Sequence, residues 1–119
     1  MTNKYDVDDI IWNWVRWCWS GKHVGNMVPY IPWRDDFRPI NINQARQVDE
    51  LLHRLQLHER MVVIAEYPQK NGRFADMHAR QRMEAARRWI AKTAKVWLTE
   101  KEYESCLRAF KNMIELEVA

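Results

Sequence analysis

The apolar positions in the last third of the chain follow two helical patterns separated by a short apolar break. Trp89, Ile90 and Ala94 form one stripe, and residues 96–98 (Val-Trp-Leu) interrupt it. Beyond the break, apolar residues recur at steps of four, three and four, which is the spacing of one face of an α-helix; they are Tyr103, Leu107, Phe110 and Ile114. The pattern therefore predicts a helix, a tight turn and a second, longer helix.

Thr99 is predicted to begin the second of these helices. Glu102 follows three positions later, and in a T-x-x-E box the hydroxyl and the carboxylate each accept a hydrogen bond from a free backbone N–H. A short helix joined to a capped helix by an apolar turn is typical of a helix-turn-helix. An ordinary helical hairpin in a bundle has the same turn length and spacing, so this pattern alone does not select DNA binding.

The remaining apolar positions predict three more helices. The first starts at Asp8 or Asp9 and ends at Trp19, and its apolar arc is so wide that it must be buried on most sides or present tryptophan to a partner chain. The second is capped by Asn43 and carries apolar residues from 48 to 55. The third runs over 58–67. The helix already predicted before the apolar turn is then the fourth in the chain, and it runs over about 73–95.

A long connection separates the first two helices. Residues 22–42 include Gly25, Pro29, Pro32 and Pro39 and show no helical period, so an extended segment is expected there. Loops of this length are usually functional or packed over the core. We therefore predict an all-α protein of about five helices with a long Pro-containing loop after the first. A single domain over 1–119 is expected, with a Trp-rich helix and loop over 1–42 and a helix-turn-helix module over 43–119.

Composition agrees with one helical core. The chain has 119 residues, of which 47% are hydrophobic, with only 3 Gly and 4 Pro. No apolar run is long enough to span a bilayer, and the acidic start (Asp6, Asp8 and Asp9) is unlike a secretory signal, which begins with positive charge. The sequence therefore predicts a cytoplasmic protein that does not bind membranes.

The positive charge is concentrated in one segment. Residues 68–95 hold eight basic and two acidic residues, net +6, whereas residues 1–67 carry −1 and residues 99–119 carry −2. A local basic stripe is the electrostatic footprint of a nucleic-acid binder. A solvated helix face, which Arg and Lys also favour, remains the alternative interpretation.

Motifs for catalysis and metal binding are absent from the sequence pattern. There is no nucleophile–base pair at a recognisable spacing, no Gly-rich phosphate loop and no C-x-x-C pair, and the four histidines lack ligand spacing. Cys18 and Cys106 each lie within an apolar helical pattern, as expected of buried thiols. The sequence thus predicts a non-enzymatic protein with no cofactor and no metal site.

Two segments of the chain follow a known order of motifs. They are VDELLHRLQLHERMVVIAEY (48–67) and RRWIAKTAKVWLTEKEYESCLRAFKNMIEL (87–116). This order resembles region 4 of bacterial sigma factors, in which two short helices precede a helix-turn-helix. The matching positions are Leu52, Leu55, Arg60, Val63 and Tyr67, then Ile90, Ala91, Val96, Thr99, Tyr103, Leu107 and Ala109. The chain departs from that pattern by an insertion over about 69–86.

The Trp-rich opening narrows the resemblance. A short tryptophan helix, a Pro/Arg loop and a sigma-like helical module are together similar to small phage antiterminators of the Q type. That resemblance implies a late-gene regulator that binds double-stranded DNA near a promoter, engages host RNA polymerase and makes it pass terminators. Some members carry a zinc finger; this chain lacks the cysteines for one, which implies kinship with the zinc-free members.

On this interpretation, the helix from Thr99 enters the major groove with its amino-terminal end first. Its expected DNA contacts are Lys101, Ser105 and Arg108. The phosphate contacts are expected on the preceding helix, at Arg80, Arg87, Arg88, Lys92 and Lys95. The glutamates at 100, 102 and 104 repel phosphate and are the chief objection to DNA binding.

A competing interpretation is a phage protein-interaction module that binds a host protein such as RNA polymerase without touching DNA. Its contact residues are expected to be Trp12, Trp19 and Trp33. A homodimer through the tryptophan surface is a third interpretation.

Overall fold

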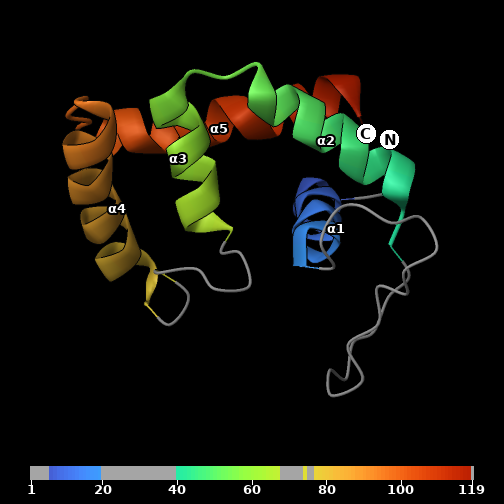
Figure 1. Cartoon of the computed structure of the whole chain (residues 1–119), viewed down its shortest axis with the longest axis horizontal. Coiled ribbons are helices and arrows are strands. Elements are labelled where there is room, and N and C mark those ends of the chain that lie inside the picture. Colours follow the sequence, from blue (N-terminus) through green and yellow to red (C-terminus); the bar gives the residue numbers. More distant parts are fainter. Residues whose placement is uncertain (1–5, 20–39, 68–73, 75–76, 119) are drawn as a thin grey trace.

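The computed structural model describes residues 6–19, 40–67, 74 and 77–118, apart from the side chain of Trp19. This part of the chain forms five helices and no strand (Figure 1). They are α1 (Val7–Trp19), α2 (Ile42–His53), α3 (Leu57–Glu66), α4 (Ala79–Ala94) and α5 (Glu100–Glu117). The all-α prediction with about five helices is therefore confirmed. The long Pro-containing loop lies outside the described residues, except near its carboxyl end.

The start of α2 corrects the sequence-based prediction. Asn41, rather than Asn43, is the N-cap, and its side chain accepts a 3.0 Å hydrogen bond from the backbone N–H of Gln44. The backbone of Asn41 is itself held by Asn13 of α1, which donates to its carbonyl and accepts from its N–H, both at 2.9 Å. This contact, 28 positions away in sequence, fixes where the helix begins.

The fourth helix begins later than predicted. Its first residue is Ala79 rather than Arg73, and the side chain of His78 caps it by accepting from the N–H of Gln81 at 3.4 Å. The third helix is shifted by one residue, because Glu59 accepts from the N–H of Gln56 at 2.9 Å and so marks Gln56 as the cap residue.

Two apolar cores lie along α5. The first is formed between α1, α2 and the carboxyl half of α5, and includes Phe110 and Ile114 together with Val63 of α3 and Tyr67, which caps the end of α3. The second lies between α3, α4 and the amino-terminal half of α5. Its buried members are Met61, Val62, Ala65, Phe74, Ala86, Ile90, Leu98 and Tyr103.

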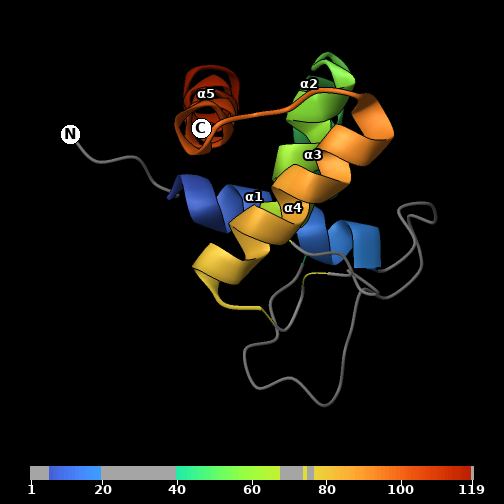
Figure 2. The ribbon, with the colours of Figure 1, turned by 90° about the vertical axis from the view of Figure 1, so that its left-hand side faces the viewer.

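Helix α5 joins the two cores. It has 18 residues, a length of about 27 Å at 1.5 Å per residue, and Leu107 near its middle packs against both cores. Figure 1 shows α4 at one end of α5 and α1 and α2 toward the other. Figure 2 views α5 nearly end-on, with α4 running diagonally below and to the right of it. None of the described helices is both long and apolar enough to cross a membrane.

The tryptophan-rich helix α1 is mainly a core element. Ile11 and Val15 are fully buried, and Trp14 and Trp17 are 2% and 8% exposed. The indole N–H of Trp14 is satisfied by the Asp49 carboxylate of α2 at 3.1 Å. The interpretation of α1 as buried on most sides is thus confirmed for these residues.

Candidate nucleic-acid interface

The turn between α4 and α5 is held at both ends. Lys95 terminates α4 in the left-handed region, at φ 61° and ψ 30°, and is the one non-glycine with a positive φ among the described residues. At the other end, the Thr99 hydroxyl accepts from the N–H of Glu102 at 3.1 Å, and the Glu102 carboxylate accepts from the N–H of Thr99 at 2.9 Å. The predicted capping box is confirmed. Between the ends, Leu98 is buried in the second core.

Arg87 braces this turn from α4. Its Nε donates a 2.8 Å hydrogen bond to the carbonyl of Leu98, and its guanidinium carbon lies 5.1 Å from the ring centre of Trp97. The cation is therefore directed at the turn and shields one face of an indole that is otherwise 61% exposed. The sequence pattern grouped Arg87 with Arg88 as a phosphate contact, but the geometry assigns Arg87 to positioning the turn.

A carboxylate at the end of α3 bonds to both α4 and α5. Glu66 accepts from the Arg82 guanidinium of α4 at 3.1 Å and from the Tyr103 hydroxyl of α5 at 2.7 Å. The side chains of Arg82 and Glu66 are largely buried, at 21% and 14% exposed. Burial, followed by the hydrogen bond to Glu66, raises the pKa of Tyr103 above its ordinary value, with a partial opposing effect from Arg82. One carboxylate thus sets three helices relative to one another.

The outer face near the start of α5 is open to solvent. Lys101, Glu104, Ser105 and Arg108 are all exposed, and their spacing of three and four places them on one helix face. The opposite face carries Tyr103, which is buried in the second core. All three residues predicted to contact DNA from this helix are therefore brought together on one accessible surface.

The basic residues of α4 separate into two groups. Arg88, Lys92 and Lys95 are exposed, on the side of the helix away from the buried Ala86 and Ile90. These three make none of the hydrogen bonds or ion pairs found among the described residues.

Arg80 is exposed but differs from those three in its partners. It makes 3.7 Å ion pairs with Glu84 of α4 and with Glu100 in the first turn of α5.

The glutamates at the start of α5 have different surroundings. Glu100 pairs with Arg80, and Glu102 is part of the capping box. Acidic side chains in a first turn also stabilise the helix through its dipole. Glu104 is exposed and makes neither a hydrogen bond nor an ion pair among the described residues. Of the three carboxylates, only Glu100 is paired with a cation, so the repulsion of phosphate is reduced at that position.

Of the three tryptophans predicted to contact a protein partner, only Trp12 has a side chain among the described residues. Trp12 lies on α1 at 36% exposed, with its ring 5.4 Å from that of Tyr67 in an edge-on arrangement. Trp19 ends α1, but its side chain lies outside the described residues, as does all of Trp33.

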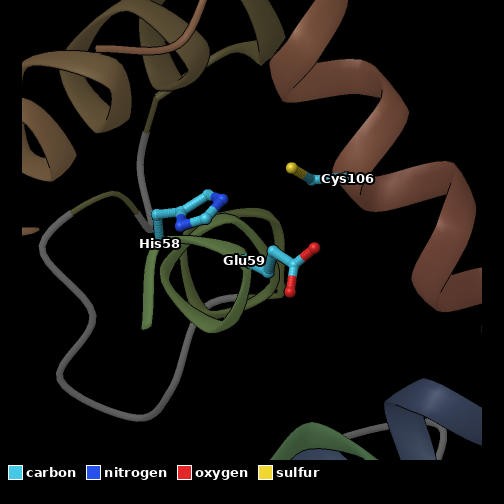
Figure 3. Close-up of side chains that lie close together, drawn as sticks. All are labelled: His58, Glu59 and Cys106. Atoms are coloured by element: carbon cyan, nitrogen blue, oxygen red, sulfur yellow. The ribbon is translucent and has the colours of Figure 1, made fainter. Parts of the chain in front are cut away.

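A group of potential metal ligands lies between α3 and α5. His58 and Glu59 lie in the first turn of α3, Cys106 lies on α5, and one ligand atom from each falls within 4.8 Å of the others (Figure 3). All three side chains are half-buried. Burial and then the charges of Glu59 and Glu102 raise the pKa of the Cys106 thiol. Sequence spacing missed this cluster because 48 positions separate His58 from Cys106; the adjacent His-Glu pair was its one local signal.

Comparisons with protein-family models, with curated proteins and with solved structures found no match to this chain. Its function must therefore be inferred from its own residues.

Proposed function

We propose that the protein is a phage transcription regulator that binds double-stranded DNA through α4 and α5 and engages host RNA polymerase. Late-gene antitermination is the process that its resemblance to Q-type proteins implies. The observation that carries the proposal is the exposed outer face of α5, which directly follows a turn held by Arg87 and by the Thr99 capping box. A rigid turn followed by an open polar helix face suits insertion into the major groove, which is wide enough to admit a helix.

In this proposal α5 supplies selectivity. Lys101 and Arg108 are cations that donate to guanine O6 and N7 or to phosphate, and Ser105 donates to a base or to the backbone. The Glu104 carboxylate accepts a hydrogen bond from the amino group at cytosine N4, so this negative side chain distinguishes cytosine from other bases. Each of these side chains is exposed on the same face of α5.

Helix α4 supplies affinity. Arg88, Lys92 and Lys95 are exposed, and no ion pair occupies them within the described residues. Phosphate contacts from such residues position the protein and carry no sequence information themselves. They also make binding depend on salt, because each neutralised phosphate releases counterions.

Binding to duplex DNA tests the proposal. Selection of binding sites from random duplexes, followed by fluorescence anisotropy over a series of salt concentrations, is expected to recover a preferred sequence and a linear loss of log affinity with log salt. Arg46→Ala is the matched control for Arg88→Ala, since Arg46 is an exposed arginine on α2, outside the two helices proposed to contact DNA. Absence of duplex binding at low salt, with the folded wild-type protein, rules out groove docking.

A protein-interaction module without DNA contact is the second candidate. The observation that favours it is Trp12, which remains 36% exposed on a helix whose other apolar residues are mostly buried. Recovery of RNA polymerase from nuclease-treated lysate by the wild-type protein, and its loss with Trp12→Ala, together with no duplex binding, would select this candidate.

A further inference from the structure

The cluster of His58, Glu59 and Cys106 combines three different kinds of metal ligand. Figure 3 shows the His58 ring and the Cys106 sulfur facing each other, with the Glu59 carboxylate below Cys106; two of the side chains come from the first turn of α3 and one from α5. An imidazole nitrogen, a carboxylate oxygen and a sulfur are the donors that bind Zn²⁺ in proteins. Hard cations such as Mg²⁺ and Ca²⁺ prefer oxygen alone, so the sulfur and nitrogen donors favour zinc over these two ions.

The three ligand atoms lie slightly farther apart than the ligands of a zinc ion do. In a tetrahedral zinc site with bonds of 2.0–2.3 Å, ligand atoms lie about 3.5 Å apart, and here they all lie within 4.8 Å of one another. All three side chains are half-buried, and we expect rotation about their side-chain bonds to close this difference. Such a site has three protein ligands and leaves a fourth position for water.

The local electrostatics favour a cation. Besides burial, the carboxylates of Glu59 and Glu102 raise the pKa of the Cys106 thiol, so both negative charges lie close enough to this sulfur to attract a cation. Glu59 already accepts from the N–H of Gln56 through one oxygen. A carboxylate has two oxygens with several lone pairs, so metal binding is compatible with that cap.

We propose that His58, Glu59 and Cys106 form a Zn²⁺ site that ties the start of α3 to α5. The metal cross-links two helices of the second core, close to Ser105 on the outer face of α5. Because a zinc-bound thiolate has lost its proton, binding releases one proton to solvent. This site does not depend on DNA binding and can be measured on the protein alone.

Metal titration of matched variants tests the site. Calorimetry with ZnCl₂ is expected to give one equivalent bound, and Co²⁺ in place of zinc is expected to give the charge-transfer absorption of a thiolate ligand. Cys106→Ser should abolish that absorption and lower zinc affinity by at least the roughly 10–100-fold that follows loss of an outer-shell partner. His58→Gln should weaken zinc in the same way, while Cys18→Ser, the control thiol on α1, should bind as the wild type does.

A second measurement needs no variant. Trypsin is expected to release Cys18 in the peptide of residues 17–22 and Cys106 in the peptide of residues 102–108. Zinc should slow alkylation of the second peptide by iodoacetamide, leave the first unchanged, and lose its effect when EDTA is added. Equal alkylation of Cys106 with and without zinc, or zinc binding by Cys106→Ser that matches the wild type, overturns the proposal.

Discussion

The Tyr103 hydroxyl on α5 donates a 2.7 Å hydrogen bond to the Glu66 carboxylate at the last residue of α3. The same carboxylate receives Arg82 from α4. Since the proposed DNA contacts lie on α4 and α5, the relative placement of the two helices depends on this small buried network as well as on apolar packing.

Tyr103→Phe is expected to destabilise the protein by about 1–3 kcal/mol. The substitution keeps the ring in the second core but removes a hydrogen bond to a charged acceptor that is 14% exposed. Urea unfolding followed by circular dichroism measures the change. A double-mutant cycle with Glu66→Ala, which removes the acceptor, should show coupling between the two positions; additive effects would mean that the hydrogen bond contributes nothing specific.

Stability is expected to fall as pH rises above about 10. The pKa values of Tyr67 and Tyr103 are raised in the folded protein, in both cases first by burial and then by a hydrogen bond to a carboxylate, whereas the unfolded side chains ionise near 10.0. Below that pH both states are protonated and the full contribution is present. Above it the unfolded state loses protons first, so folding becomes less favourable.

Urea midpoints measured between pH 8 and pH 11 would show this decline. Tyr103→Phe should have a shallower pH dependence than the wild type, because one of the two raised tyrosine pKa values has been removed. An unchanged slope in Tyr103→Phe would contradict the assignment to this tyrosine.

Arg87→Ala and Arg88→Ala are expected to have different effects. Arg87 holds Leu98 and lies over Trp97, so its loss should lower the unfolding free energy by about 1–3 kcal/mol. Arg88 is exposed, so its loss should leave stability within about 0.5 kcal/mol.

The two variants should also separate in DNA binding. Arg88→Ala should weaken binding similarly for all duplexes and reduce the slope of log affinity against log salt by about 0.9. Thermal unfolding and fluorescence anisotropy on the same samples give both quantities. Equal loss of stability in the two variants would contradict the role assigned to Arg87.

Lys95→Gly is expected to raise stability and lower DNA affinity together. A side chain with a Cβ in the left-handed region costs about 1–2 kcal/mol, and Lys95 occupies that region at φ 61°. Glycine removes this cost, although it also gives the unfolded chain more freedom, so a net gain of about 0.5–1 kcal/mol is expected. The same change removes a proposed phosphate contact.

Lys95→Ala is the matched comparison for that variant. It removes the same charge but keeps the Cβ, so it should lose DNA affinity without gaining stability. A Lys95→Gly protein that is less stable than Lys95→Ala would show that the left-handed position carries no strain.

Features that depend on residues three or four positions apart were predictable from the sequence. The helical period located α5, and the Thr99–Glu102 box set its first residue, because both partners of that cap lie within one turn. The buried face of α1 followed from the same periodicity. The exposed face of Lys101, Ser105 and Arg108 was likewise visible, since it is the complement of the apolar stripe.

Features that depend on distant residues required the folded chain. Asn13 bonds to the backbone of Asn41 and so places the start of α2 there. The carbonyl of Leu98 accepts a hydrogen bond from Arg87, which directs this side chain toward the turn, whereas Arg88 is exposed. His58 and Cys106 meet because α3 and α5 pack together in the second core. Local spacing carries no information about such pairs, because hydrogen bonds and ligand geometry depend on distances in space, and apolar packing between helices sets those distances.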